Sequence, residues 1–176
     1  MGLLDSNAEE LMPLDSSGGR VTIDCVHHEV HDGSHFTNFH AMTMDSVTAH
    51  TVTITAPASA VGFIHLVLEV ESTAAGTWTF SESPESSAGS TLTAYNNKRN
   101  STSTSGTTIK GNVVWTSAGT VLEQHYIGAN NPGSKLGGGA SVRNEYILKP
   151  STTYGIRFVN TAATTYSVIE TYFYLD

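Results

Sequence analysis

The chain has 176 residues, 8 Lys and Arg against 16 Asp and Glu, a formal net charge of −8, and one cysteine. This length suits one domain with a sizeable core, and the acidic balance argues against a nucleic-acid binder, which needs clustered cations to neutralise phosphates. A single cysteine excludes an internal disulfide and a cysteine-rich zinc module, and no apolar run approaches the ~20 residues of a membrane-spanning helix.

The first twenty residues differ from the rest and predict an N-terminal arm over residues 1–20, followed by a folded domain over residues 21–176. A short helix can start at Ser6, but Pro13 ends it, and a Ser/Gly hinge follows. Five apolar side chains in fourteen residues favour an arm that docks on a neighbouring protein, although a free terminus is the alternative. These candidate anchors are Leu3, Leu4, Leu11, Met12 and Leu14.

Beyond residue 20 the sequence breaks into short runs rich in Thr and Val, separated by Gly, Ser, Asn and Pro. Ser and Thr together make up 44 of the 176 residues, whereas 14% are charged. This composition and the alternating apolar pattern predict strands. We expect an all-β antiparallel β-sandwich, most simply jelly-roll-like, with an immunoglobulin-like sandwich as the alternative. In chain order the predicted strands cover residues 21–26, 36–49, 50–56, 61–71, 76–80, 91–95, 107–116, 120–128, 141–148, 153–160 and 166–175.

Charge is unevenly distributed along this chain. Residues 1–90 contain 12 acids and one base, a net charge of −11, and residues 91–176 contain 4 acids and 7 bases, a net charge of +3; the sum is −8. Such a chain can form an oligomer in which an acidic side meets a basic side. The other interpretation is that chain order says little about surface position in a sandwich.

A cluster of histidines between Cys25 and His40 is the densest group of chemically versatile side chains. His27, His31 and His35 are spaced four residues apart, and Asp32 and His28 lie among them. In an extended strand, Cα atoms four residues apart are ~13 Å apart, too far for two imidazoles to share one ion. The cluster therefore predicts a hydrogen-bonded strand–turn–strand with structural or oligomer contacts and no metal; a metal site and a pH-sensitive contact are the alternatives.

Nothing in the sequence predicts a catalytic site or a cofactor. Cys25 lies in a predicted strand with alternating apolar residues, so we expect a packed side chain and not a reactive thiol. The sequence contains no nucleophile motif and no phosphate-loop motif. Glu69 and Glu71 share one strand face, which is typical of a solvated edge more than of a glycosidase pair. Three aromatic residues could instead form a flat carbohydrate-binding surface, although core packing is the usual role of tryptophan. They are Trp78, Trp115 and Tyr95.

Four segments, in order, resemble small tailed-bacteriophage virion proteins of the capsid decoration (cement) family. Residues 27–36 (HHEVHDGSHF) resemble an HHxIHxGxxF stretch, and residues 92–101 (LTAYNNKRNS) resemble a YNxNRNS stretch. Residues 145–154 (EYILKPSTTY) resemble an EWILKPNTTY stretch, and residues 172–174 (YFY) resemble an aromatic closing strand.

This resemblance implies a head structural protein on the outer capsid surface of a virion, with a β-sandwich body, a homotrimeric state and the major capsid protein as its partner. It implies no enzyme activity and no binding to nucleic acid or to a membrane. A tail or head-fibre component with a carbohydrate- or receptor-binding sandwich is the alternative. The segments mark candidate structural or oligomer contacts at His27, His28, His31, Asp32, His35, Tyr95, Asn97, Arg99 and Asn100.

Overall fold

The computed structural model describes residues 25–45, 48–58, 62–127, 136–137, 145–160 and 164–175. The predicted arm and its anchors Leu3, Leu4, Leu11, Met12 and Leu14 lie outside the described residues, as does most of the first predicted strand. No helix in the described part of the chain is long and apolar enough to cross a membrane.

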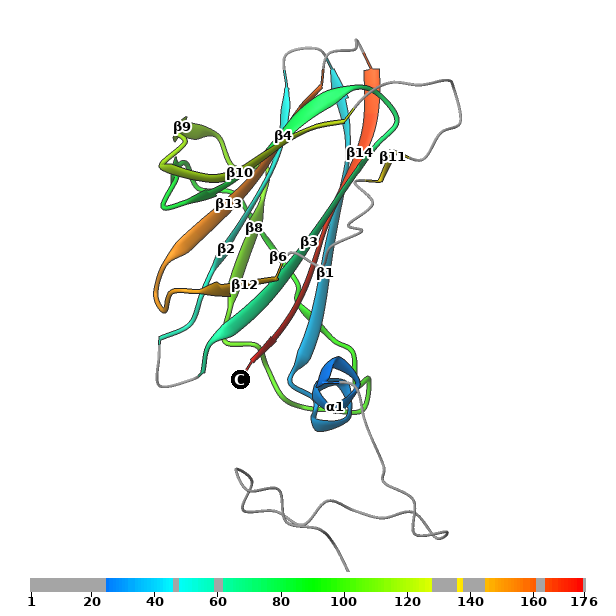
Figure 1. Ribbon diagram of the computed structural model, residues 1–176, viewed down its shortest axis with the longest axis vertical. Coiled ribbons are helices and arrows are strands. Elements are labelled where there is room, and N and C mark those ends of the chain that lie inside the picture. Colours follow the sequence, from blue (N-terminus) through cyan, green and yellow to red (C-terminus); the bar gives the residue numbers. More distant parts are fainter. Residues whose placement is uncertain are drawn as a thin grey trace, which may run out of the picture.

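Two six-stranded antiparallel sheets pack against each other and confirm the predicted all-β sandwich (Figure 1). The first, here called the β14 sheet, has the order β11 (Leu136–Gly137), β3 (Ile64–Ser72), β14 (Thr164–Leu175), β1 (His35–Asp45), β7 (Tyr95–Asn96), and β12 (Glu145–Leu148) also pairs with β3. The second, the β13 sheet, has the order β10 (Thr120–Ile127), β4 (Gly76–Glu82), β13 (Thr153–Asn160), β2 (Ala49–Thr55), β8 (Thr108–Gly111), β6 (Ser90–Leu92). A small third sheet pairs β5 (Glu85–Ser86) with β9 (Trp115–Ser117).

The core lies between the two large sheets and follows the period of two that the sequence displays. In β14, Ile169, Thr171 and Phe173 are fully buried, while Tyr166 on the opposite face is exposed. In β2, Val52 and Ile54 point inward as predicted. Burial of each large apolar side chain contributes ~1.5–3 kcal/mol, so this layer dominates the stability of the fold. Its largest fully buried members are Phe36, Phe80, Phe158, Phe173, Met44, Ile54, Ile64, Leu66, Ile109, Leu148, Ile156 and Ile169.

Most predicted strands occur at the expected places, but two are divided: residues 91–95 between β6 and β7, which belong to different sheets, and residues 107–116 between β8 and β9. Asn112 has a φ of 56°, a left-handed conformation that turns the chain out of the β13 sheet. Its backbone N–H donates to the carbonyl of Thr51 at 3.0 Å, which holds the turn against β2. The jelly-roll arrangement, which is more specific than a sandwich, stays a prediction.

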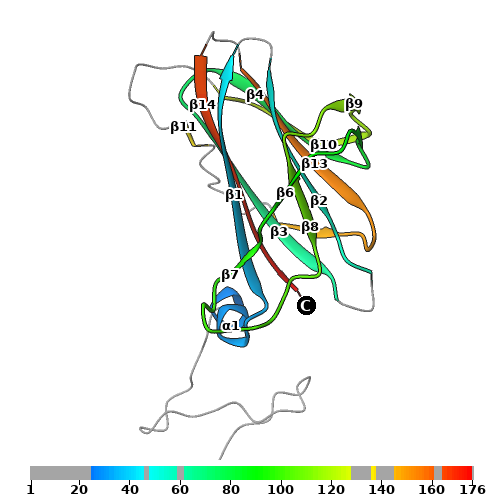
Figure 2. The same ribbon diagram turned by 180° about the vertical axis from the view of Figure 1, so that it is seen from behind.

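The first described element is a helix, α1 (Cys25–Asp32), at one end of the sandwich beside the start of β1 (Figures 1 and 2). Figure 2 also shows β7 next to α1, although the two are about 65 residues apart in sequence. This end of the molecule, here called the α1 end, brings together two of the four segments that carry the family resemblance.

Candidate functional site

The predicted strand–turn–strand over the histidine cluster is wrong, because Cys25–Asp32 is helical. Gly33 does not interrupt the helix but ends it: its φ is 80°, and the backbone N–H groups of Gly33 and Ser34 donate to the carbonyl of Glu29 at 3.1 and 3.0 Å. A glycine in the left-handed conformation just after a helix is a common C-terminal cap. Val30, a single β-branched residue, opposes the helix by only a few tenths of a kcal/mol.

The loop after β7 clamps the end of α1. The Asn96 side-chain amide donates to the Gly33 carbonyl at 2.7 Å, and its Oδ1 accepts from the Lys98 backbone N–H at 2.8 Å. A Cβ on Gly33 would lie 2.7 Å from the Ser101 hydroxyl, so a larger residue would displace that side chain in addition to straining the left-handed backbone. The resembling segments 27–36 and 92–101 therefore form one packed unit.

His35 and Asn97 join this unit to the β14 sheet. The Asn97 side-chain amide lies 2.8 Å from His35 Nδ1, and its backbone N–H donates to the His35 carbonyl at 3.0 Å. Arg99 Nη1 donates to the Asn96 carbonyl at 3.3 Å, and its guanidinium lies 5.8 Å from the centre of the Tyr95 ring. Asn100 lies in the exposed turn that follows. The predicted contact residues of this loop thus include Asn97, which is exposed and bound to His35, and Asn100, which is exposed in the turn.

Three histidines of α1 are exposed to solvent. The Nε2 atoms of His27 and His31 lie 3.0 Å apart, on one face of the helix. His28 is directed to the acidic residues, with its Nδ1 3.4 Å from Asp32 and 3.7 Å from Glu29. Among the described residues no group of three or more His, Cys, Asp and Glu side chains is arranged to hold a metal ion.

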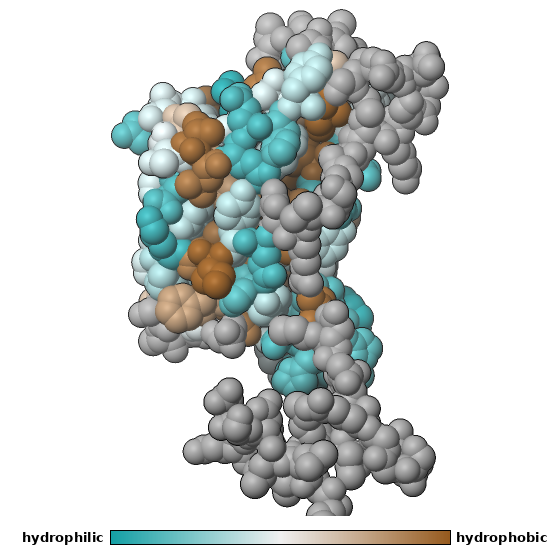
Figure 3. Space-filling view, viewed as in Figure 1, coloured by the Kyte–Doolittle hydropathy of each residue, from teal (hydrophilic) through white to brown (hydrophobic). Residues whose placement is uncertain are grey.

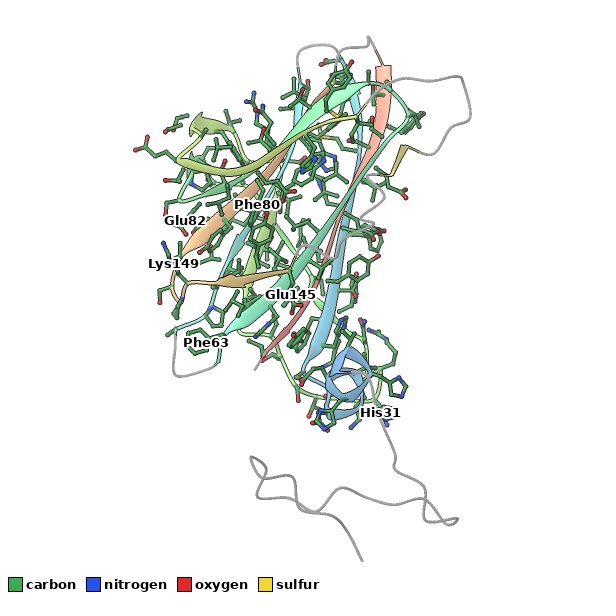
Figure 4. All side chains as sticks on the ribbon, viewed as in Figure 1. His31, Phe63, Phe80, Glu82, Glu145 and Lys149 are labelled. Carbon is green, nitrogen blue, oxygen red and sulfur yellow. The ribbon has the colours of Figure 1, made fainter. Side chains whose placement is uncertain are left out.

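The third and fourth resembling segments also meet, on the outer face of the β14 sheet, where Glu145 contacts Tyr174 (Glu145 is labelled in Figure 4). Glu145 Oε1 accepts from the Tyr174 hydroxyl at 2.6 Å and lies 2.9 Å from His65 Nδ1. The His65 and Tyr174 rings stack with centroids 4.5 Å apart. Since Tyr174 pairs across strands with His35, a continuous polar row runs from β12 to the clamp. The first, second and fourth segments therefore lie at the α1 end, and Glu145 connects the third segment to them.

An ion pair fixes the turn between β12 and β13. Lys149 Nζ lies 2.8 Å from Glu82 Oε1, and the Tyr154 hydroxyl donates to Glu82 Oε2 at 3.0 Å (Figure 4). The hydrogen bond from Lys149, then that from Tyr154, lowers the pKa of Glu82. The same contact with Glu82 raises the pKa of Lys149. The motif 145–154 thus sets the geometry of this turn.

Glu69, Glu71 and Glu170 form an acidic row on the outer face of the β14 sheet. Glu69 and Glu170 are direct cross-strand partners, and Glu71 follows on the same face of β3. The Tyr172 hydroxyl donates to Glu170 at 2.7 Å, and this bond, together with burial and the three carboxylates, raises the pKa of Tyr172. The predicted pair Glu69 and Glu71 thus gains a third member, Glu170.

The three aromatic residues considered for a carbohydrate platform do not share one face. Trp78 lies on the inner side of the β13 sheet and stacks on His125 at 4.9 Å. Trp115 lies over Gly155 on the outer side of that sheet, so close that a Cβ on Gly155 would be 2.4 Å from its ring. Tyr95 belongs to the other sheet.

A buried polar chain, here called the histidine chain, connects the two sheets. His40 Nδ1 lies 2.8 Å from His50 Nε2, and His50 Nδ1 lies 2.6 Å from the Ser167 hydroxyl. The Ser167 hydroxyl in turn contacts the Met44 sulfur at 3.1 Å. Burial, and secondarily the neighbouring His40, lowers the pKa of His50 to about 3, and burial lowers that of His40.

Exposed apolar side chains accompany these polar clusters. Figure 3 shows apolar groups over β10 and near β12 on one face of the sandwich. Val121, Leu122 and Ile147 are between 42 and 63% exposed, and Phe63 nearby is 47% exposed. Exposed apolar groups that gather on one face are typical of protein interaction sites.

Comparisons with known proteins identify no relative: no protein-family model, curated protein or solved structure matches this chain.

Several residues of these clusters could not be selected from the sequence. Asn96 lies inside the resembling segment 92–101, but only the structure shows that Asn96, and not Asn97, holds α1. His50 and Ser167 are 117 residues apart and belong to no motif. Glu145 and Tyr174 belong to two resembling segments, and their proximity follows from the sheet order alone.

Replacing Asn96 by Ala should destabilise the fold, because it leaves the Gly33 carbonyl and the Lys98 N–H without their shared partner. The expected loss in free energy of unfolding is ~1–3 kcal/mol, measured by urea denaturation. Asn100→Ala in the same loop is the matched control and should change stability by less than ~0.5 kcal/mol. Equal losses for the two variants would contradict the clamp.

Proposed function

We propose that this chain is a structural protein of a tailed-bacteriophage virion, a decoration protein that binds the outer capsid surface and bridges capsomers. The observation that carries the proposal is the surface of the described residues. Ten large apolar side chains there are 37% or more exposed, while only 14% of the chain is charged. Such a surface favours contact with other protein.

The resembling segments support the same assignment. Three of them, residues 27–36, 92–101 and 172–174, lie at the α1 end, and residues 145–154 reach this group through the Glu145–Tyr174 contact. The Leu175 N–H donates to the Ser34 carbonyl at 3.2 Å, so the last strand also contributes. Residues that hold such a junction have a structural role. A capsid protein without enzyme activity needs residues of this kind and no catalytic group.

A homotrimer is part of the proposal, and the distribution of charge supports it. Among the described residues, the acidic row lies on the outer face of the β14 sheet, whereas Lys110 and Arg157 lie on the outer face of the β13 sheet. Opposite charges on opposite faces favour head-to-tail contacts between copies, and such contacts form a closed ring when the rotation permits.

The physical role follows from the load on a DNA-filled shell. Packed DNA presses outward and separates neighbouring capsomers, and a trimer seated over a junction holds their seams together. An interface of ~800 Å² per partner is typical of stable complexes. Three linked copies add avidity, and the apolar arm anchors extend the contact without enlarging the body.

A tail or head-fibre role with carbohydrate binding is the second candidate, and one surface favours it. Phe39, 57% exposed, and Tyr95, 45% exposed, lie on the outer face of the β14 sheet, where Phe39 pairs directly with Glu170. Aromatic rings beside carboxylates are suited to the apolar faces and hydroxyls of sugars.

Binding to empty shells assembled from the cognate major capsid protein tests the proposal. We expect the full chain to be trimeric by mass measurement and to cosediment with the shells. Replacing Leu3 and Leu4 by Ser should weaken binding by at least ~100-fold, because each buried leucine contributes ~1.5 kcal/mol or more.

The matched control replaces Ser16 and Ser17 by Ala in the same arm and should bind as the parent does. If the full chain is a monomer that does not bind shells but binds a glycan array, the tail or head-fibre role replaces the decoration role.

A further inference from the structure

We propose that His27 and His31 of α1 form a two-histidine chelate for a divalent late first-row transition metal ion, with water in the remaining positions. This inference is independent of the virion assignment. It rests on the 3.0 Å distance between the two Nε2 atoms, on the exposure of both rings and on the rigid attachment of the helix.

The distance between the nitrogen atoms suits a metal ion. Two metal–nitrogen bonds of ~2.05 Å enclose an angle of about 94° when the nitrogens are 3.0 Å apart. This is close to the 90° between neighbouring ligands of a tetragonal or octahedral ion, whereas a tetrahedral ion needs about 3.3 Å. Cu²⁺ and Ni²⁺ prefer such geometry with nitrogen ligands, and Cu²⁺ binds most tightly in the divalent series.

The helix creates this proximity. Residues four apart share one helix face, so both imidazoles project from the same side of α1, while His28 is turned by about 100° toward Glu29 and Asp32. The rings are tilted by 60° with centroids 4.6 Å apart. Rotation about the broad second side-chain torsion directs both Nε2 lone pairs to one point, where the ion replaces the proton that the two nitrogens now share.

Two features of the surroundings favour a cation at this place. His31 lies in the last turn of α1, where the unpaired carbonyl groups of the helix end carry partial negative charge. The helix is held by the Gly33 cap and by Asn96, so little conformational freedom is lost on binding. Because both rings are already exposed, an ion keeps its remaining water ligands.

Calorimetric titration of the tag-free, metal-stripped full chain with Ni²⁺ at pH 7.5 tests the site. We expect one ion per chain, and a loss of affinity of roughly tenfold or more for His27→Ala and for His31→Ala, because each removes one of two protein ligands. Electron paramagnetic resonance of the Cu²⁺-loaded chain should show two equivalent nitrogen ligands in the parent and one in either variant.

Two controls address the number of histidines and the fold. His28→Ala changes an exposed histidine of the same helix and should leave affinity within about twofold. The double variant His31→Ala, Ser86→His keeps eight histidines but moves the second ring from α1 to the exposed strand β5, and should bind as weakly as His31→Ala. Circular dichroism confirms that each variant is folded.

Absence of Ni²⁺ binding by the parent chain, or an equal loss of affinity for His28→Ala, would overturn the proposal. Restoration of binding by Ser86→His in the double variant would overturn it as well, because the helix spacing would then be irrelevant.

Discussion

Replacing Phe80 by Ala is expected to lower the free energy of unfolding by ~3–5 kcal/mol. Phe80 is fully buried, and its ring lies 4.8 Å from that of Tyr146 and 5.7 Å from that of Tyr154. Both tyrosines are fixed at their hydroxyls, Tyr146 by Glu123 and Tyr154 by Glu82. They cannot move freely into the space left by the missing ring, so the cavity stays open.

Urea denaturation with fluorescence detection measures this loss. Phe39→Ala is the matched control, because Phe39 is 57% exposed on the outer face of β1, and we expect less than ~1 kcal/mol there. Domains of this size have total stabilities of about 5–15 kcal/mol, so the Phe80→Ala variant can unfold during purification. Phe80→Leu, which keeps more volume, then gives a smaller loss of ~1–2 kcal/mol. Equal effects at Phe80 and Phe39 would contradict the assignment of the core.

The second large effect is the loss of stability in acid caused by the histidine chain. The folded state holds His50 neutral, with its pKa lowered to about 3, whereas an unfolded chain protonates it near pH 6.5. Between these pH values the unfolded state binds about one proton more. The free energy of unfolding should therefore decrease by roughly 1.4 kcal/mol for each pH unit below 6.5. Above pH 6.5 His50 is neutral in both states, so it no longer lowers the free energy of unfolding. The pKa of His40 is also lowered by burial, so His40 adds to the loss of stability in acid.

Urea unfolding at a series of pH values from 7.5 to 4.5 measures this slope. His50→Gln removes the titrating group and should flatten the slope by close to one proton, whatever its effect on stability at pH 7.5. His28→Gln is the control, since the side chain of His28 is 59% exposed, and the parent slope should persist. An unchanged slope in His50→Gln would show that other groups, such as His40 or the carboxylates, cause the acid sensitivity.

The strands of this fold could largely be predicted from the sequence, for a simple physical reason. A strand in a sandwich has one face in the core, so its pattern is local: Val52 and Ile54 alternate with threonines, and Ile169 and Phe173 alternate with polar residues. The division of residues 107–116 was missed because it depends on a single left-handed residue, Asn112. Asparagine adopts the left-handed conformation only where its surroundings stabilise it, and here the Asn112 N–H donates a hydrogen bond to the Thr51 carbonyl.

The helix could not be predicted, because tertiary contacts stabilise it. Eight residues are too few for a helix to be stable alone, and α1 is stabilised by Asn96, which lies about 65 residues beyond it. The same dependence applies to the site. His27 and His31 were selected as part of a dense cluster, but an extended strand would separate them, and only the helix brings their nitrogens together. The pairing of Glu145 with Tyr174 required the sheet order.

The acidic row on the outer face of the β14 sheet and the cations Lys110 and Arg157 on the outer face of the β13 sheet separate part of the charge of the described residues. Such a separation of charge orients a subunit before it touches a second copy, which raises the rate of productive encounters at low ionic strength. At 0.15 M salt the field decays over ~8 Å, so this orienting torque acts only at the last moment of approach. For the proposed homotrimer, the speed of assembly, more than the strength of the finished ring, should then respond to added salt.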